Sequence, residues 1–297
     1  MNKRSLLVVT LVMLCGQSPA WGEGLPWEVK TPFKEATIHY ELTGMEQGKE
    51  ILYIKDSGAR QAKHRTSTAT MMGTSKKTQT IDITDPDWIY TYDLIEKKGG
   101  KTTNPNKIYR TEYAKLNAEE KKNVEKNAKE LGAGGMLGEF GSVKQKAAKV
   151  LGYDCDIASV GGISTVYILQ GTGIPLKAEA SVMGMNSNVT ATKVDTSSAI
   201  PDSAFAPPAG ITAQLDQQME SMTTDMIKNT IDTLKKPDGA KQMQQAGPMG
   251  MMGGGAGMQP MMEKEMQAEG ISQKEQQEMM RQMNEAMQQM QKQQPKK

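Results

Sequence analysis

Histidine and cysteine, the residues that most often carry acid-base, nucleophilic or metal chemistry, are scarce in this chain of 297 residues. Its two histidines, His39 and His64, belong to no HExxH or similarly spaced ligand set. No GxSxG motif is present, and Cys155 lies in GYDCDIAS without an identifiable base. Paired carboxylates remain an open alternative, although no spacing singles out a pair. We therefore expect a protein that is not an enzyme and a buried Cys155.

A glycine cluster between residues 132 and 141 is the second candidate for chemistry, because glycine-rich loops bind phosphate groups. The cluster matches neither GxGxxG nor GxxxxGK. We interpret it as a flexible loop, and the sequence predicts no cofactor.

Methionine is the unusual residue of this chain, since 13 of its 24 methionines lie between Pro237 and Lys297. Soft thioether sulfurs suit Cu(I), which gives one hypothesis for this region. The candidate Cu(I) ligands are Met249, Met251, Met252, Met258, Met261 and Met262. Flexible methionines also form adaptable apolar contacts. One alternative is therefore that this C-terminal tail binds an envelope protein, and another is that the tail has no function.

The first twenty residues have the organisation of a secretory signal peptide. Two basic residues precede an apolar run at 5–14, and Ser18 and Ala20 are small residues at the positions that signal peptidase reads. The run has about half of the 20 residues that a membrane-spanning helix needs. We therefore expect cleavage after Ala20 and a periplasmic or secreted protein. A retained anchor is the alternative, whereas lipid attachment at Cys15 is disfavoured because Leu14 precedes it.

The charge balance argues against nucleic acid as a partner. Without Lys3 and Arg4, the 36 basic residues become 34 and equal the 34 acidic residues. A neutral chain exerts no long-range attraction on phosphate backbones. Since only Cys155 stays after cleavage, no internal disulfide forms, and core burial has to stabilise the fold.

Apolar and polar residues alternate in many short segments between residues 34 and 211, which predicts strands with one buried face. These segments are 37–42, 49–55, 80–83, 88–94, 164–169, 176–182 and 188–194, and turn residues separate them. The pattern predicts an antiparallel meander. The last aromatic residue is Phe205, so we place the folded domain at 21–211.

Helices are predicted at three places. Asn117 and Glu120 have capping-box spacing at the start of a helix over 117–131. An amphipathic helix follows the sheet and ends before Pro237. Its apolar face is expected to pack on the sheet, and contact with a membrane or a partner is the alternative. The predicted segments of the C-terminal part are this helix at 212–236, a disordered Gly/Met/Gln-rich linker at 237–270, and a short Met/Gln-rich helix at 271–297 that has the spacing of a coiled coil.

Several motifs between residues 34 and 211 carry a family resemblance. They are GKEILYIKDSGAR, DPDWIYTYDL, KVLGYDC, IPLKAEA and PDSAFAPPAG. The chain resembles an uncharacterised family of exported domains with a lipoprotein-carrier-like fold of the LolA/LolB type. The resemblance implies a mainly β, α+β fold, in which a curved antiparallel half-barrel with covering helices encloses acyl chains.

A bent sheet needs its concave apolar surface covered by its own helices or by a ligand. The residues that we nominate for such a cavity are Ile38, Tyr40, Leu52, Ile54, Trp88, Tyr90 and Tyr92. The alternative for each of them is an ordinary core position. The sequence thus predicts a binding protein for a hydrophobic or acylated ligand, with a Cu(I)-binding protein or an interaction protein that acts through its tail as alternatives.

Overall fold

The computed structural model describes residues 25, 31–71, 74–135, 141–160, 163–182 and 185–251. The predicted signal peptide and the predicted helix at 271–297 lie outside these residues. The described residues up to Pro248 belong to one compact unit, which contains the whole sheet.

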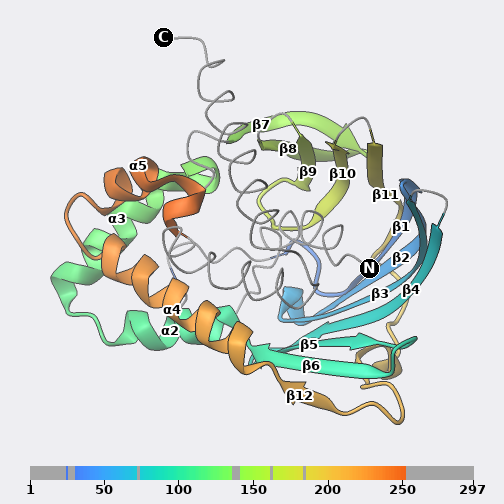
Figure 1. Cartoon of the computed structure of the whole chain (residues 1–297). Helices are drawn as coiled ribbons and strands as arrows, with labels where there is room; N and C mark the ends of the chain where they lie inside the picture. The colour runs from blue at the N-terminus through green and yellow to red at the C-terminus, as the bar shows by residue number, and fades with distance from the viewer. Residues whose placement is uncertain are drawn as a thin grey trace, which may run out of the picture. The chain divides into compact units, whose positions relative to one another are not determined.

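The fold is mainly β, as the sequence predicts, and the described residues form one unclosed sheet of 12 strands with helices at one side (Figure 1). The strands are β1 (Ala36–Gly44), β2 (Glu46–Lys55), β3 (Arg60–Met71), β4 (Thr74–Thr84), β5 (Trp88–Asp93), β6 (Lys98–Thr103), β7 (Gly141–Val150), β8 (Tyr153–Val160), β9 (Ser164–Leu169), β10 (Pro175–Val182), β11 (Met185–Asp195) and β12 (Ala213–Leu215).

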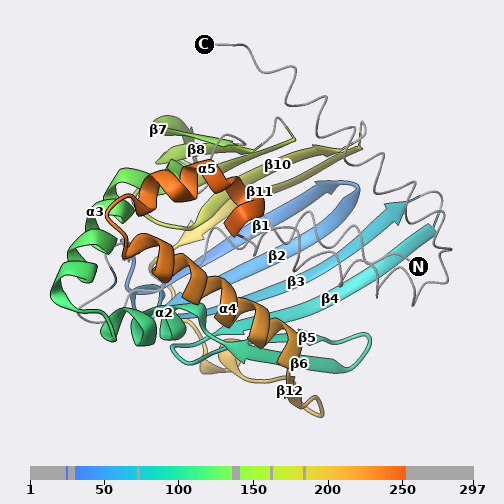
Figure 2. The ribbon, with the colours of Figure 1, turned by 60° about the vertical axis from the view of Figure 1, so that its left-hand side comes forward.

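The sheet consists of two antiparallel meanders, β1 to β6 and β7 to β11, which join where β1 pairs with β11. The short strand β12 adds to β6 in parallel orientation. Figure 2 shows that the strands curve into an open trough. The predicted meander is therefore confirmed, in two halves that meet in the middle of the sheet.

The segments predicted from alternation include no part of β3, β6, β7, β8 or β12. In β3 both faces are largely polar, with Lys63 and Arg65 on one side and His64 and Thr66 on the other. Strand β6 has the sequence KGGKTT, which lacks apolar residues altogether. Their formation depends on hydrogen bonding to neighbouring strands, which an alternation pattern does not report.

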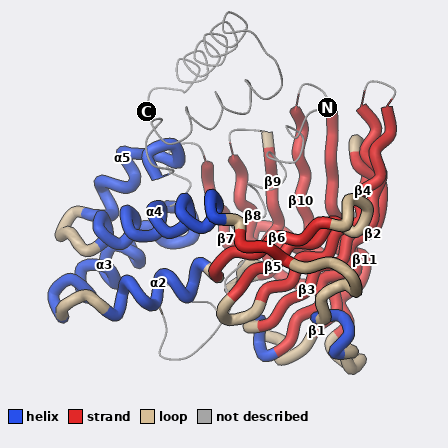
Figure 3. Tube along the Cα trace, turned by 60° about the horizontal axis from the view of Figure 1, so that its bottom comes forward, coloured by secondary structure: helices blue, strands red, loops and turns tan. Residues whose placement is uncertain are grey.

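The helices are α2 (Pro105–Ala114), α3 (Ala118–Gly135), α4 (Gln217–Leu234) and α5 (Gly239–Met251). They gather at the open side of the sheet (Figure 3). Their main contacts with the sheet are those of α4 with β6 and of α3 with β7, which lie near its two ends. No helix in the described part of the chain is long and apolar enough to span a membrane.

Two predicted helices are confirmed and two were not predicted. Asn117 caps α3 by accepting from the amide of Glu120, whose carboxylate accepts from the amide of Asn117, as a capping box requires. Helix α4 matches the predicted amphipathic helix. Helix α5 occupies part of the segment predicted as a disordered linker, because Ala240 and Met243 find buried positions that the composition does not reveal.

Candidate functional site

The strand register assigns each nominated cavity residue to one of two faces of the sheet. Directly paired residues of antiparallel strands share a face. One row of pairs runs through Ile38, Leu52, Lys63, Asp82 and Thr91. We call this side the Leu52 face, and the opposite side, which carries Tyr92 beside Thr91, the Tyr92 face.

The seven nominated residues do not line one cavity, because the register separates them. Those on the Leu52 face are Ile38, Tyr40, Leu52 and Ile54, and those on the Tyr92 face are Trp88, Tyr90 and Tyr92. Alternation along a strand shows which residues share a face of that strand. It does not show which faces of distant strands coincide, since that depends on the pairing register.

The aromatic residues of β5 contribute to the core on the Tyr92 face. Tyr92 is 2% exposed and clusters with Ile200 and Phe205, which belong to the chain segment after β11. The rings of Tyr90 and Tyr92 stack with centroids 6.3 Å apart. The PDSAFAPPAG segment, which includes the 3₁₀ helix η3 (Asp202–Phe205), thus covers this face.

The Leu52 face carries a separate apolar cluster. Its buried members are Ala36, Ile38, Tyr40, Leu42, Leu52, Ile54, Cys155, Leu169, Ile174, Leu176, Val189 and Ala191. Ile38 and Ile54 have no exposed surface, whereas Leu52 and Val189 are the most exposed members at 9%. In the described part of the chain, every member comes from a strand or a loop and none from a helix.

Tyr40 is the polar residue at the centre of this apolar cluster. Its hydroxyl donates a 2.8 Å hydrogen bond to the carbonyl oxygen of Pro175. Burial, together with the negative charge of Glu50, raises the pKa of the phenol well above its ordinary value. The ring therefore stays neutral and contributes apolar surface.

A charged network borders the apolar cluster on the same face, and the sequence did not predict it. Arg65 on β3 donates from Nε to Oε2 of Glu50 at 2.7 Å, and its Nη1 lies 3.5 Å from Oε2 of Glu46. Ser67 donates to the other oxygen of Glu46. Lys63 pairs with Asp82 at 3.0 Å on the neighbouring strands.

This network is more buried than an ordinary surface ion pair. The side chains of Arg65 and Glu50 are 12% and 5% exposed. Burial alone would lower the pKa of Arg65, but Glu50 and Glu46 outweigh it and raise that pKa. Arg65 lies 15 residues from Glu50 and 19 residues from Glu46 in the chain. Their proximity in space therefore follows only from the pairing of β2 with β3.

Cys155 and His64, whose side-chain types can take part in catalysis, make structural contacts in this fold. Cys155 is buried as predicted, its thiol donates weakly to the carbonyl oxygen of Tyr153, and burial raises its pKa. The Nε2 atom of His64 lies 2.8 Å from the carbonyl oxygen of Ala204. Among the described residues, no group of three or more His, Cys, Asp or Glu side chains could hold a metal ion.

The Cu(I) hypothesis concerns residues at the limit of the described chain. Met249 and Met251 belong to α5, while Met252, Met258, Met261 and Met262 lie outside the described residues. It stays a prediction.

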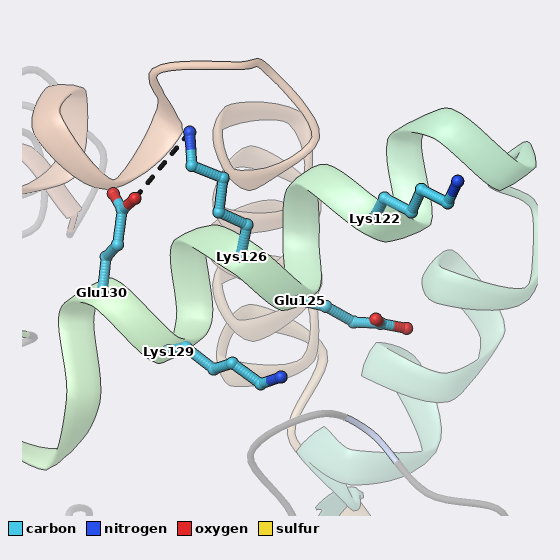
Figure 4. A pocket seen from close by; sticks show the side chains of 5 residues that line it. All are labelled: Lys122, Glu125, Lys126, Lys129 and Glu130. Carbon is cyan, nitrogen blue, oxygen red and sulfur yellow. Dashed lines mark ion pairs between the residues drawn. The ribbon is translucent and has the colours of Figure 1, made fainter.

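A shallow hollow on α3 is lined only by charged side chains (Figure 4). These are Lys122, Glu125, Lys126, Lys129 and Glu130. The pair between Lys126 and Glu130 spans 3.8 Å, and both side chains are more than half exposed. Such pairs contribute little energy in water, so we interpret the hollow as a solvated helix face.

No family model and no curated protein matches this chain. Solved structures show distant similarity. An uncharacterized conserved protein from Thermus thermophilus matches over 71% of this chain and 99% of its own, with 6% identity and a TM-score of 0.36. LprF from Mycobacterium bovis matches over 66% and 96%, with 9% identity and a TM-score of 0.26. PNGF-II matches over 66% of this chain but 33% of its own, with 15% identity and a TM-score of 0.35.

Proposed function

We propose that this chain is an exported, non-enzymatic binding protein that holds a hydrophobic or acylated ligand against the Leu52 face. The observation that supports this is the composition of the apolar cluster there. Strands and loops supply its described members, whereas the helices make their main contacts near the two ends of the sheet. A lipoprotein-carrier-like mode of action, as the sequence motifs suggest, fits this arrangement, and the signal-like residues 1–20 suggest export.

The ligand would contact the border of the cluster and not its centre. Ile38 and Ile54 are completely buried by neighbouring residues, so they support the sheet. Leu52 and Val189 retain exposed surface and are the residues that an acyl chain would reach first. Burial of apolar surface contributes about 25 cal/mol per Å², so one sheltered chain supplies a useful affinity after the cost of ordering it.

Binding of a fluorescent fatty-acyl probe to the delipidated full chain tests this proposal. Leu52→Gln should weaken binding about tenfold, which corresponds to roughly 1.4 kcal/mol. Ile51→Gln is the matched control, because Ile51 is the neighbouring residue on the opposite face and is half-buried. Circular dichroism should show that both variants fold. Absence of binding by the wild-type chain, or equal losses in both variants, would contradict the proposal.

The alternative function is Cu(I) binding by the methionines of the tail, which the number of methionines after Pro237 favours. One deletion distinguishes the two candidate functions. Removal of residues 249–297, which takes away all six candidate methionines, should leave acyl-probe binding unchanged if the sheet is the site, and should abolish Cu(I) binding if the tail is the site.

A further inference from the structure

Apolar and charged residues meet on the Leu52 face along a line that crosses β2, because Leu52 and Ile54 lie on the same strand and face as Glu46 and Glu50. Leu52 on β2 pairs with Lys63 on β3, and Leu42 on β1 shares a row with Ser67 through Gly48. A ligand whose apolar part lies on the apolar side of this line therefore has its polar end beside the charged network.

Counted over the described residues, the network next to this line has one negative charge in excess. The pair of Lys63 with Asp82 is balanced, whereas the single guanidinium of Arg65 faces both Glu50 and Glu46. Glu50 holds the short contact and is 5% exposed. Glu46 lies at 3.5 Å and is 19% exposed, which makes it the less compensated and more accessible carboxylate.

Among the described residues, Arg65 is the ion-pair partner of Glu46, and the next basic residue in its row lies further away. Its row continues through Ala69 to Lys76 on β4, so that Lys76 lies two strands away and is exposed. Ser67 donates a hydrogen bond to Glu46 and is 4% exposed, which fixes the carboxylate beside the apolar border.

On the basis of the proposed function, we infer that the ligand is an amphiphile whose polar end carries an ammonium group. The apolar chain would lie along Leu52 and Val189, the most exposed members of the cluster, and the ammonium group would approach Glu46. A free fatty acid would bring a second negative charge to the same place. Coulomb repulsion at an effective dielectric constant of about 20 would weaken its binding.

Three probes with the same alkyl chain test this inference: dodecylamine, dodecanol and dodecanoate, used as monomers at neutral pH with the full chain. We expect dodecylamine to bind most tightly and dodecanoate at least about tenfold more weakly. Glu46→Gln keeps an acceptor for Ser67 and should therefore fold. It should remove the advantage of dodecylamine over dodecanol and leave dodecanol binding unchanged.

Glu41→Gln is the matched control, because Glu41 is an exposed carboxylate on the other face of the neighbouring strand β1. It should leave all three affinities unchanged. If dodecanol binds but dodecanoate binds as tightly as dodecylamine, or if Glu46→Gln leaves the preference intact, the inference is wrong while the proposed function stands. If no probe binds, both are overturned.

Discussion

The side-chain amide of Asn127 in α3 donates a 2.7 Å hydrogen bond to the carbonyl oxygen of Leu234, the last residue of α4. The same amide donates to the carbonyl oxygen of Lys236 at 2.7 Å, and Asn127 has no exposed surface. A helix end leaves its last carbonyl groups without partners inside the helix. Helix α3 therefore caps α4 from the side and ties together the helices near the ends of the sheet.

Asn127→Ala should lower the free energy of unfolding by about 2–4 kcal/mol, because it leaves two carbonyl groups without their donor in a buried place. Asn123→Ala is the control. Asn123 makes one 3.0 Å bond, to Lys235, and should cost about 1 kcal/mol. Urea denaturation measures both, and equal losses would show that Asn127 has no special role.

Gly48→Ala should destabilise the protein, because an added Cβ would lie 2.2 Å from the carbonyl oxygen of Thr66 in the neighbouring strand. We expect a loss of about 1–3 kcal/mol. Gly100 is the matched strand glycine, since a Cβ there meets nothing within 4 Å. Gly100→Ala should be neutral or slightly stabilising. Thermal unfolding of the two variants compares them, and a neutral Gly48→Ala would be inconsistent with the close strand packing.

Ile54→Ala should cost about 2–5 kcal/mol, because the side chain is fully buried in the cluster of the Leu52 face. Ile51→Ala on the other side of the same strand should cost less, since its side chain is half-buried. Denaturant midpoints give the comparison. A larger loss at Ile51 would mean that the register assigns the wrong face to the core.

Tyr92→Ala should lower the stability by about 3–5 kcal/mol and leave acyl-probe binding per folded molecule unchanged. The reason is that Tyr92 packs with Ile200 and Phe205 on the face opposite Leu52. Titration of the probe at a temperature where the variant is folded separates the two effects. Weaker binding by the folded variant would show that the Tyr92 face takes part in ligand binding.

Asp195→Asn should lower the melting temperature at neutral pH. The carboxylate accepts hydrogen bonds from Lys193 and from the backbone amides of Ser197 and Ser198, and these hold its pKa well below the ordinary value. A lowered pKa in the folded state contributes stability that is complete above the unfolded value of about 3.9 and is lost as the pH falls further. The difference between wild type and variant should therefore shrink below about pH 4. A constant difference from neutral to acid pH would contradict this.

The sequence by itself determined the class of the fold and the elements with a strong local signal. Alternation at Ile38, Tyr40 and Leu42 predicted β1 because the strand has one buried face. The capping box at Asn117 predicted the start of α3 because both of its hydrogen bonds are local. Elements without local signals, such as β6 with its sequence KGGKTT, escaped prediction because their stability comes from neighbouring strands.

Only the tertiary structure decided which residues share a face. Tyr92 and Leu52 have the same apolar character in the sequence, but the pairing of β2 through β5 places them on opposite sides of the sheet. The same pairing brings Glu46 and Glu50 to Arg65, although nothing in the local sequence links them. Register is a non-local property, because a shift of one residue would exchange every side chain between the two faces.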